Sequence, residues 1–136
     1  MIYEATKRFT WEGAHQLSDS HHPECQRTHG HGYKMEVTIG SKHLDRRGMV
    51  IDFKILNEIV NPIVDRYDHA LITVENFGEN PTAENMAVRI YNEVTFALDK
   101  RMHDSGLICT KIRIWETENC SVTVRAPQEV WDDVCS

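Results

Sequence analysis

Hydrophobic and polar residues alternate along four stretches of the chain, and this period of two predicts β-strands that bury one face. Tyr33, Met35 and Val37 share one face of the second stretch, with charged or polar residues between them. A polar turn at 116–119 joins the last two stretches and predicts a hairpin. The four predicted strands span Ile2 to Ala14, Tyr33 to Ile39, Leu107 to Trp115 and Cys120 to Ala126.

Two further stretches repeat apolar residues at the spacing of an amphipathic helix. Asp52 is placed to N-cap the first, which runs from Phe53 to Tyr67. Pro62 lies inside this pattern, so we expect a kink or a local break just before it. Thr82 is placed to N-cap the second helix, which we expect to end near Met102.

The predicted order is strand, strand, helix, helix, strand, strand. This order favours an α+β fold, with a four-stranded antiparallel sheet and two helices on one of its faces. The chain of 136 residues has the length of one domain, so we expect a single domain over residues 1–136. Gln16 to Gly30 shows no period and is predicted to be a long loop, a kind of segment that often carries function.

Composition and charge exclude several classes of partner. The formal net charge is −6 and no long basic stretch is present, which argues against nucleic acid and anionic membranes. No apolar run approaches the length of a membrane span, and the first residues lack the pattern of a secretory signal. Four cysteines in such a chain indicate reduced thiols and a cytoplasmic location. Eight histidines suggest metal or acid–base chemistry.

The sharpest chemical feature is the pair His29 and His31. Side chains two residues apart on an extended segment point the same way, so both imidazoles can reach one ion. Gly30 between them leaves room for a ligand, and His15 at the end of the first strand can supply a third nitrogen. Three histidines with an open position are typical of catalytic zinc; the alternative is a set of ordinary histidines without metal.

Cys25 precedes this pair by four residues and has three interpretations: a zinc ligand, a catalytic base or nucleophile, or a buried thiol. A cation lowers the pKa of a nearby thiol, and a fourth ligand would close the site, so we favour the catalytic base. The neighbouring His21 and His22 are interpreted as exposed loop residues.

Two other groups of residues are candidates for proton transfer or ligand binding. Asp68 directly precedes His69, and a carboxylate beside an imidazole can orient it for proton relay. The alternative is a histidine that stabilises a helix C-terminus. Glu116 ends a predicted strand, where it could accept paired N–H donors from an aminopyrimidine-type ring, or be a solvated turn acid.

Taken together, these pieces resemble the family of 6-pyruvoyltetrahydropterin and 6-carboxytetrahydropterin synthases. The resemblance runs in order through most of the chain. It rests on Phe9-Thr10-Trp11-Glu12-Gly13-Ala14-His15, Cys25 to His31, Val50-Ile51-Asp52-Phe53, Asp68-His69, Asn80-Pro81-Thr82-Ala83-Glu84-Asn85 and Trp115-Glu116-Thr117.

The resemblance implies a tunnelling fold whose subunits join their sheets edge to edge, commonly as homohexamers with sites between subunits. It implies that the small-molecule substrate is 7,8-dihydroneopterin triphosphate. The family's roles fall on His15, His29 and His31 for zinc, on Cys25 for the base, on Asp68 and His69 for the relay, and on Glu116, Thr82 and Glu84 for pterin contacts. The chain shows no glycine-rich phosphate loop, and Arg27 is a candidate for triphosphate binding.

Two branches of this family compete. The three-residue gap between Cys25 and His29 resembles the bacterial 6-carboxytetrahydropterin synthases of queuosine and 7-deazapurine biosynthesis. The pyruvoyl enzymes of tetrahydrobiopterin synthesis typically have a longer gap and are the alternative. A zinc-bearing pterin-binding module without turnover and a simple zinc hydrolase are further alternatives, and the combination of Cys25 with Asp68 and His69 argues against a mere binder.

Overall fold

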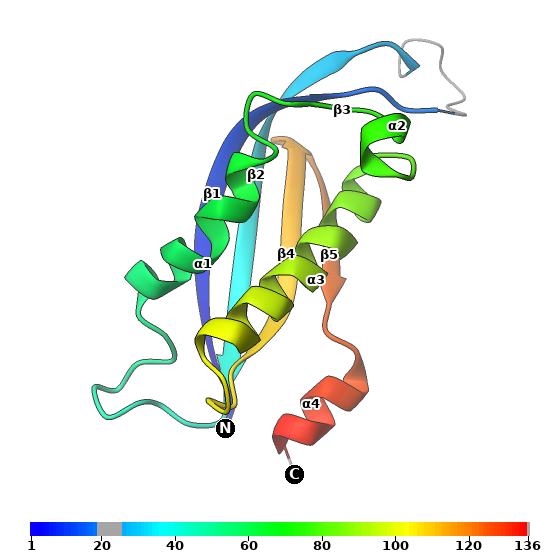
Figure 1. Ribbon diagram of the computed structural model, residues 1–136. Coiled ribbons are helices and arrows are strands. Elements are labelled where there is room, and N and C mark those ends of the chain that lie inside the picture. The colour runs from blue at the N-terminus through cyan, green and yellow to red at the C-terminus, as the bar shows by residue number, and fades with distance from the viewer. Residues whose placement is uncertain (19–25, 136) are drawn as a thin grey trace.

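The computed structural model describes residues 1–18 and 26–135 and has a curved sheet with helices packed mainly on one face (Figure 1). Both chain termini lie at the same end of the molecule. In chain order the elements are β1 (Tyr3–His15), β2 (His29–Ser41), α1 (Phe53–Asp65), β3 (Leu71–Ile72), α2 (Val74–Phe77), α3 (Ala83–Arg101), β4 (Ile108–Thr117), β5 (Cys120–Arg125) and α4 (Gln128–Cys135).

The sheet is built around a long antiparallel pair. β1 and β2 stay in register over their whole length, from Tyr3 opposite Ser41 to His15 opposite His29. β4 pairs with β2 and β5 with β4, both antiparallel, so the hairpin predicted from the polar turn is confirmed. The strand order is β3-β1-β2-β4-β5, which leaves β3 at one edge and β5 at the other.

The predicted α+β fold is confirmed, but the prediction of four strands in a purely antiparallel sheet is wrong. The described residues form a fifth strand, β3, that pairs parallel to β1. Two residues are too few to show a hydrophobic period, so no pattern could indicate this strand. β2 also begins at His29 rather than at Tyr33, because the pairing with β1 continues into the stretch predicted to be a loop.

Helices α1 and α3 cover one face of the sheet, and the core lies between the two layers (Figure 1). The apolar stripes predicted for both helices are buried there, as the helical spacing requires. The most completely buried core side chains include Met35, Val37 and Ile39 of β2, Ile112 and Ile114 of β4, Leu56 and Val60 of α1, and Met86, Ile90 and Val94 of α3.

Both predicted N-caps are confirmed: the Asp52 side chain accepts a hydrogen bond from the Lys54 N–H, and the Thr82 side chain accepts one from the Asn85 N–H. α1 nevertheless runs without a break through Pro62 and ends at Asp65. Pro62 lies on the exposed face, as does Glu58, whose carbonyl loses its helical partner. Water can satisfy that carbonyl, which explains why the expected break is absent.

The prediction of two helices is also wrong, because the structure adds the short helix α2 and the C-terminal helix α4. α2 spans four residues and begins with a capping box formed by Thr73 and Asn76. A helix of one turn lies below the length at which spacing can be detected. α4 follows β5 at the end of the molecule that carries the termini (Figure 1). The ring of Trp131 in this helix lies beside Gly40 of β2.

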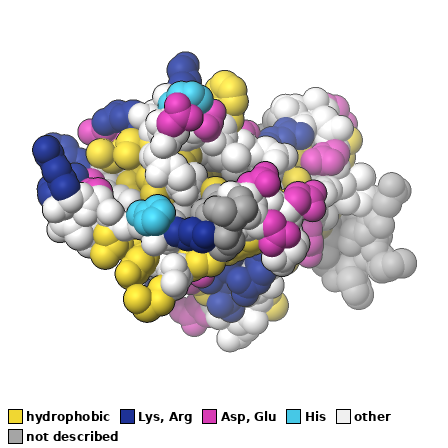
Figure 2. Space-filling model, turned by 90° about the horizontal axis from the view of Figure 1, so that it is seen from below, with side chains coloured by type: hydrophobic (Ala, Val, Ile, Leu, Met, Phe, Trp, Pro, Cys, Tyr) yellow, Lys and Arg dark blue, Asp and Glu magenta, His cyan; other side chains and the backbone are white. Residues whose placement is uncertain are grey.

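Figure 2 shows one face of the molecule, on which lysine and arginine side chains are interspersed with acidic ones. Within the described ranges, no helix has both the length and the apolar character needed to cross a membrane.

Candidate metal centre and ligand pocket

Three histidines come together where β1 ends and β2 begins. His15 lies opposite His29, and His31 follows two residues later on the same face of β2. The His15 Nε2 atom is 2.7 Å from the His29 Nε2 atom and 3.2 Å from the His31 Nε2 atom. One ligand atom from each of the three rings lies within 4.8 Å of the others, so the cluster could hold a metal ion.

Hydrogen bonds on the far side of two rings show why the cluster fits a cation. The His15 Nδ1 atom lies 2.9 Å from the Pro81 carbonyl oxygen, and the His29 Nδ1 atom lies 2.9 Å from the Arg27 carbonyl oxygen. A carbonyl only accepts, so both Nδ1 atoms must carry their protons. In the neutral rings the two Nε2 atoms then face each other with lone pairs, an arrangement that a shared cation relieves.

Burial favours the neutral form of the imidazoles in the cluster. His15 is 1% exposed, and this desolvation lowers its pKa to about 4. The hydrogen bond to Pro81 opposes the shift, whereas His29 and His31 add to it. Burial also lowers the pKa of His31, although the charge of Glu116 acts in the opposite direction. Neutral imidazole is the form that binds metal, so these environments favour the ligand form near neutral pH.

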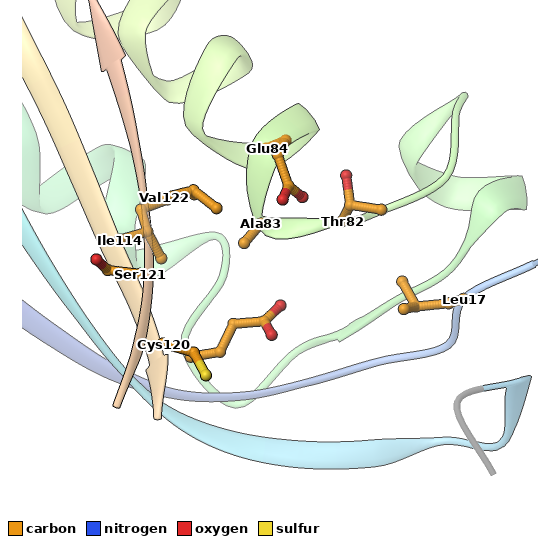
Figure 3. A pocket seen from close by; sticks show the side chains of 9 residues that line it. Leu17, Thr82, Ala83, Glu84, Ile114, Cys120, Ser121 and Val122 are labelled. Carbon is orange, nitrogen blue, oxygen red and sulfur yellow. The ribbon is translucent and has the colours of Figure 1, made fainter. Parts of the chain in front are cut away.

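A pocket of about 300 Å³ opens beside the cluster and contains all three predicted pterin contacts: Thr82, Glu84 and Glu116. Figure 3 shows Thr82 and Glu84 at the start of α3, facing side chains of β4 and β5 across the pocket. Leu17, two residues after His15, forms another part of its wall. The Pro81 carbonyl that binds His15 directly precedes Thr82 of the pocket wall, so the pocket and the metal cluster are adjacent.

Asp68 and His69 are paired but lie elsewhere in this chain. The Asp68 Oδ1 atom is 3.0 Å from the His69 Nδ1 atom and accepts a hydrogen bond from the Glu12 N–H at 3.1 Å. The His69 N–H in turn donates to the Glu12 carbonyl. His69 has a left-handed backbone (φ 56°), and its side chain is 79% exposed. This pair therefore lies beside β1, near the β3 edge, and does not line the Glu116 pocket.

The remaining predicted residues are placed only in part. Arg27 is exposed, and it contributes its backbone carbonyl to His29. Cys25 lies outside the described residues, as do His21 and His22.

Sequence reasoning missed Tyr33 as part of the site. Its ring stacks on Trp11, with centroids 5.1 Å apart, and contacts the rings of His15 and His31 edge-on. Tyr33 is 2% exposed, and its hydroxyl has no hydrogen-bond partner among the described atoms. Its position two residues after His31 on one strand face was the available signal.

We expect Tyr33→Phe to leave the free energy of unfolding unchanged or to raise it by up to about 1 kcal/mol, because it removes a buried polar atom without a partner. Thermal and urea denaturation measure this change. Tyr33→Ala is the control and should cost about 3–5 kcal/mol, as expected for emptying an aromatic core position. A loss above about 1 kcal/mol in Tyr33→Phe would show that the hydroxyl has a partner, such as a buried water.

Comparison with solved structures identifies the class of fold. The chain matches the 6-pyruvoyl tetrahydropterin synthase of Caenorhabditis elegans with a TM-score of 0.75 and 21% identity, covering 93% of this chain and 97% of that one. It matches the Plasmodium falciparum 6-pyruvoyl tetrahydropterin synthase with a TM-score of 0.72 and 18% identity, covering 92% and 98%. The fold is therefore the tunnelling fold of the pterin synthases.

The sequence places the chain within that class. The pattern that defines the 6-pyruvoyl tetrahydropterin synthase family matches residues 4–127, and the chain belongs to this family. A 6-carboxy-5,6,7,8-tetrahydropterin synthase of Rickettsia typhi is 32% identical, over 90% of this chain and all of that protein. One of Haemophilus influenzae is 33% identical, over 85% of this chain and 94% of that protein.

Proposed function

We propose that the protein is a zinc-dependent 6-carboxy-5,6,7,8-tetrahydropterin synthase, a carbon–carbon lyase. It converts 7,8-dihydroneopterin triphosphate and one water into 6-carboxytetrahydropterin, acetaldehyde and triphosphate, in the cytoplasm and in the route to queuosine and other 7-deazapurines. The observation that carries the proposal is the three-histidine cluster next to the pocket that contains Glu116: the His15 ring bonds to Pro81, and Thr82 lines the pocket. Relatives that are 30–36% identical and carry this enzyme's name support it.

His15, His29 and His31 would hold the zinc through their Nε2 atoms, since hydrogen bonds to backbone carbonyls occupy Nδ1 of the first two. The His15 Nε2 atom lies 2.7 Å from the His29 Nε2 atom and 3.2 Å from the His31 Nε2 atom, so the three rings already present their nitrogens to one place. When bound, zinc supplies a Lewis acid for the hydroxyl-bearing side chain of the substrate.

The pocket would hold the pterin ring. The Glu116 carboxylate can accept two N–H donors of the aminopyrimidine edge, and its charge makes both hydrogen bonds stronger than neutral ones. Thr82 and Glu84 add an acceptor and a second carboxylate from the start of α3. Arg27, which is exposed, remains the candidate for contact with the triphosphate.

Proton transfer would fall to Cys25 as the base at the substrate side chain and to the Asp68–His69 pair as the relay. The Asp68 carboxylate lies 3.0 Å from the His69 Nδ1 atom and can orient the imidazole ring, which a relay needs. In the strand order the pair lies at the β3 side, whereas the pocket lies between α3, β4 and β5. Joining the β5 edge of one subunit to the β3 side of the next would bring the two together, as expected in a homohexamer.

The product distinguishes this function from its alternatives. Zinc-loaded protein incubated with 7,8-dihydroneopterin triphosphate should release acetaldehyde, trapped with a hydrazine reagent, together with 6-carboxytetrahydropterin identified by mass spectrometry. Consumption of the substrate without acetaldehyde, with a pyruvoyl product, would establish the 6-pyruvoyl enzyme instead. Binding of the pterin without turnover would establish a binding module instead.

A further inference from the structure

Asn80 connects two segments that are far apart in the sequence. Its side-chain Oδ1 atom accepts a hydrogen bond from the Ser18 N–H at 2.9 Å, and its Nδ2 atom donates to the Ser18 carbonyl at 3.1 Å. The amide thus pairs with both backbone groups of one residue, as a neighbouring strand would. Ser18 directly follows Leu17 in the pocket wall and lies three residues after His15.

The backbone around Asn80 is itself fixed. Its carbonyl accepts hydrogen bonds from the Thr82 N–H at 2.8 Å and from the Asn85 side chain at 2.9 Å. The next carbonyl, that of Pro81, accepts a hydrogen bond from the Nδ1–H group of His15. The short segment from Asn80 to Thr82 therefore contacts Ser18 and the candidate metal ligand His15, and it forms part of the pocket wall.

We propose that Asn80 is a positioning residue that sets both the metal affinity and the pocket wall by holding Ser18 against the start of α3. The chain leaving β1 is fixed on one side by the hydrogen bond from the Gln16 N–H to the Ile72 carbonyl. Asn80 fixes it on the other side. Without that second contact, Leu17 would no longer be held against the start of α3. The Pro81 carbonyl would also no longer be fixed opposite the Nδ1 atom of His15.

The chemistry at this position requires an amide. Aspartate at position 80 can still accept from the Ser18 N–H, but it has no proton to donate and sets a charged oxygen against the Ser18 carbonyl. Alanine removes both hydrogen bonds. The contact uses only backbone atoms of Ser18, so the Ser18 side chain is not part of it.

The test is the zinc affinity of the metal-free protein, measured by competition with a chromophoric chelator in the absence of substrate. We expect Asn80→Asp and Asn80→Ala each to weaken zinc binding about 10-fold, the lower end of the effect of losing an outer-shell partner, because the Pro81 carbonyl remains but is no longer held in place. Ser18→Ala should change it less than about twofold. Steady-state kinetics should then show a raised KM for both Asn80 variants, because Leu17 borders the ligand pocket.

Asp45→Ala separates positioning from general loss of stability. The Asp45 carboxylate also bonds two backbone groups, the Arg47 N–H and the Met49 N–H, but in the turn between β2 and α1, at the opposite end of β2 from His29. This variant should lower the thermal midpoint without changing zinc affinity. Wild-type zinc affinity in folded Asn80→Asp would overturn the proposal. The expected change in KM rests on the proposed function, whereas the zinc-affinity test does not. A protein that binds zinc but makes no product would therefore contradict the proposed function and leave the role of Asn80 standing.

Discussion

Replacing either His29 or His31 by alanine will abolish stoichiometric zinc binding, with content falling from one ion per chain to less than about a tenth. Each ring contributes one Nε2 atom to a cluster in which the ligand atoms lie within 4.8 Å of one another. With two nitrogens left, the His15 ring keeps its bond to Pro81 but loses the shared ion. Turnover of 7,8-dihydroneopterin triphosphate should fall with the metal, by at least about 1,000-fold.

Metal analysis by mass spectrometry after gel filtration measures this directly. His103→Ala is the matched control, because His103 is an exposed histidine outside the cluster that forms ion pairs with Asp99 and Asp104. It should retain full zinc content and activity. Near-stoichiometric zinc in both His29→Ala and His31→Ala would disprove the assignment of the cluster as the metal centre.

Mixed oligomers will recover activity when one chain lacks the base and the other lacks the relay. Cys25→Ala alone should keep zinc but lose turnover by at least about 100-fold, and His69→Ala should behave alike. If each site combines Cys25 of one subunit with His69 of the next, equal mixing leaves about a quarter of the sites with both groups intact. The placement of His69 at the β3 side and of Glu116 on the β5 side motivates this expectation.

Co-expression of the two variants with different affinity tags, followed by tandem purification, provides the mixed species. The control mixes Cys25→Ala with the double variant Cys25→Ala, His69→Ala, which contains no intact base and should stay inactive. Activity of the first mixture at the level of its separate components would show that base and relay belong to one chain. Zinc loss in Cys25→Ala would instead identify Cys25 as a ligand.

The sequence predicted those parts of the fold in which a residue's local chemistry or spacing is enough to assign its structural role. Asp52 and Thr82 could be assigned as N-caps because their short oxygen-bearing side chains satisfy free N–H groups. The shared face of His29 and His31 follows from the period of a strand. β3 and α4 carried no such signal: β3 has two residues, and the position of α4 depends on contacts with distant strands.

The candidate site, too, was predictable only where sequence spacing alone places the residues. Spacing indicated the histidines, but only the β1–β2 register shows that His15 lies opposite His29. The contribution of Tyr33 was hidden, since an alternating aromatic in a strand is normally just core. The role of Asn80 was hidden too, because its partner Ser18 is 62 residues away and contributes only backbone atoms.

The sheet ends in two unlike borders, the short β3 beside β1 and the six-residue β5. If subunits join the β3 border of one chain to the β5 border of the next, every contact is alike and has a direction, so the assembly closes only when the last chain meets the first. Each contact would add a fixed rotation, because β-sheets twist with one hand. The number of subunits in such a ring would be determined by an angle rather than by the contact area, and a chain with one blocked border would prevent the ring from closing.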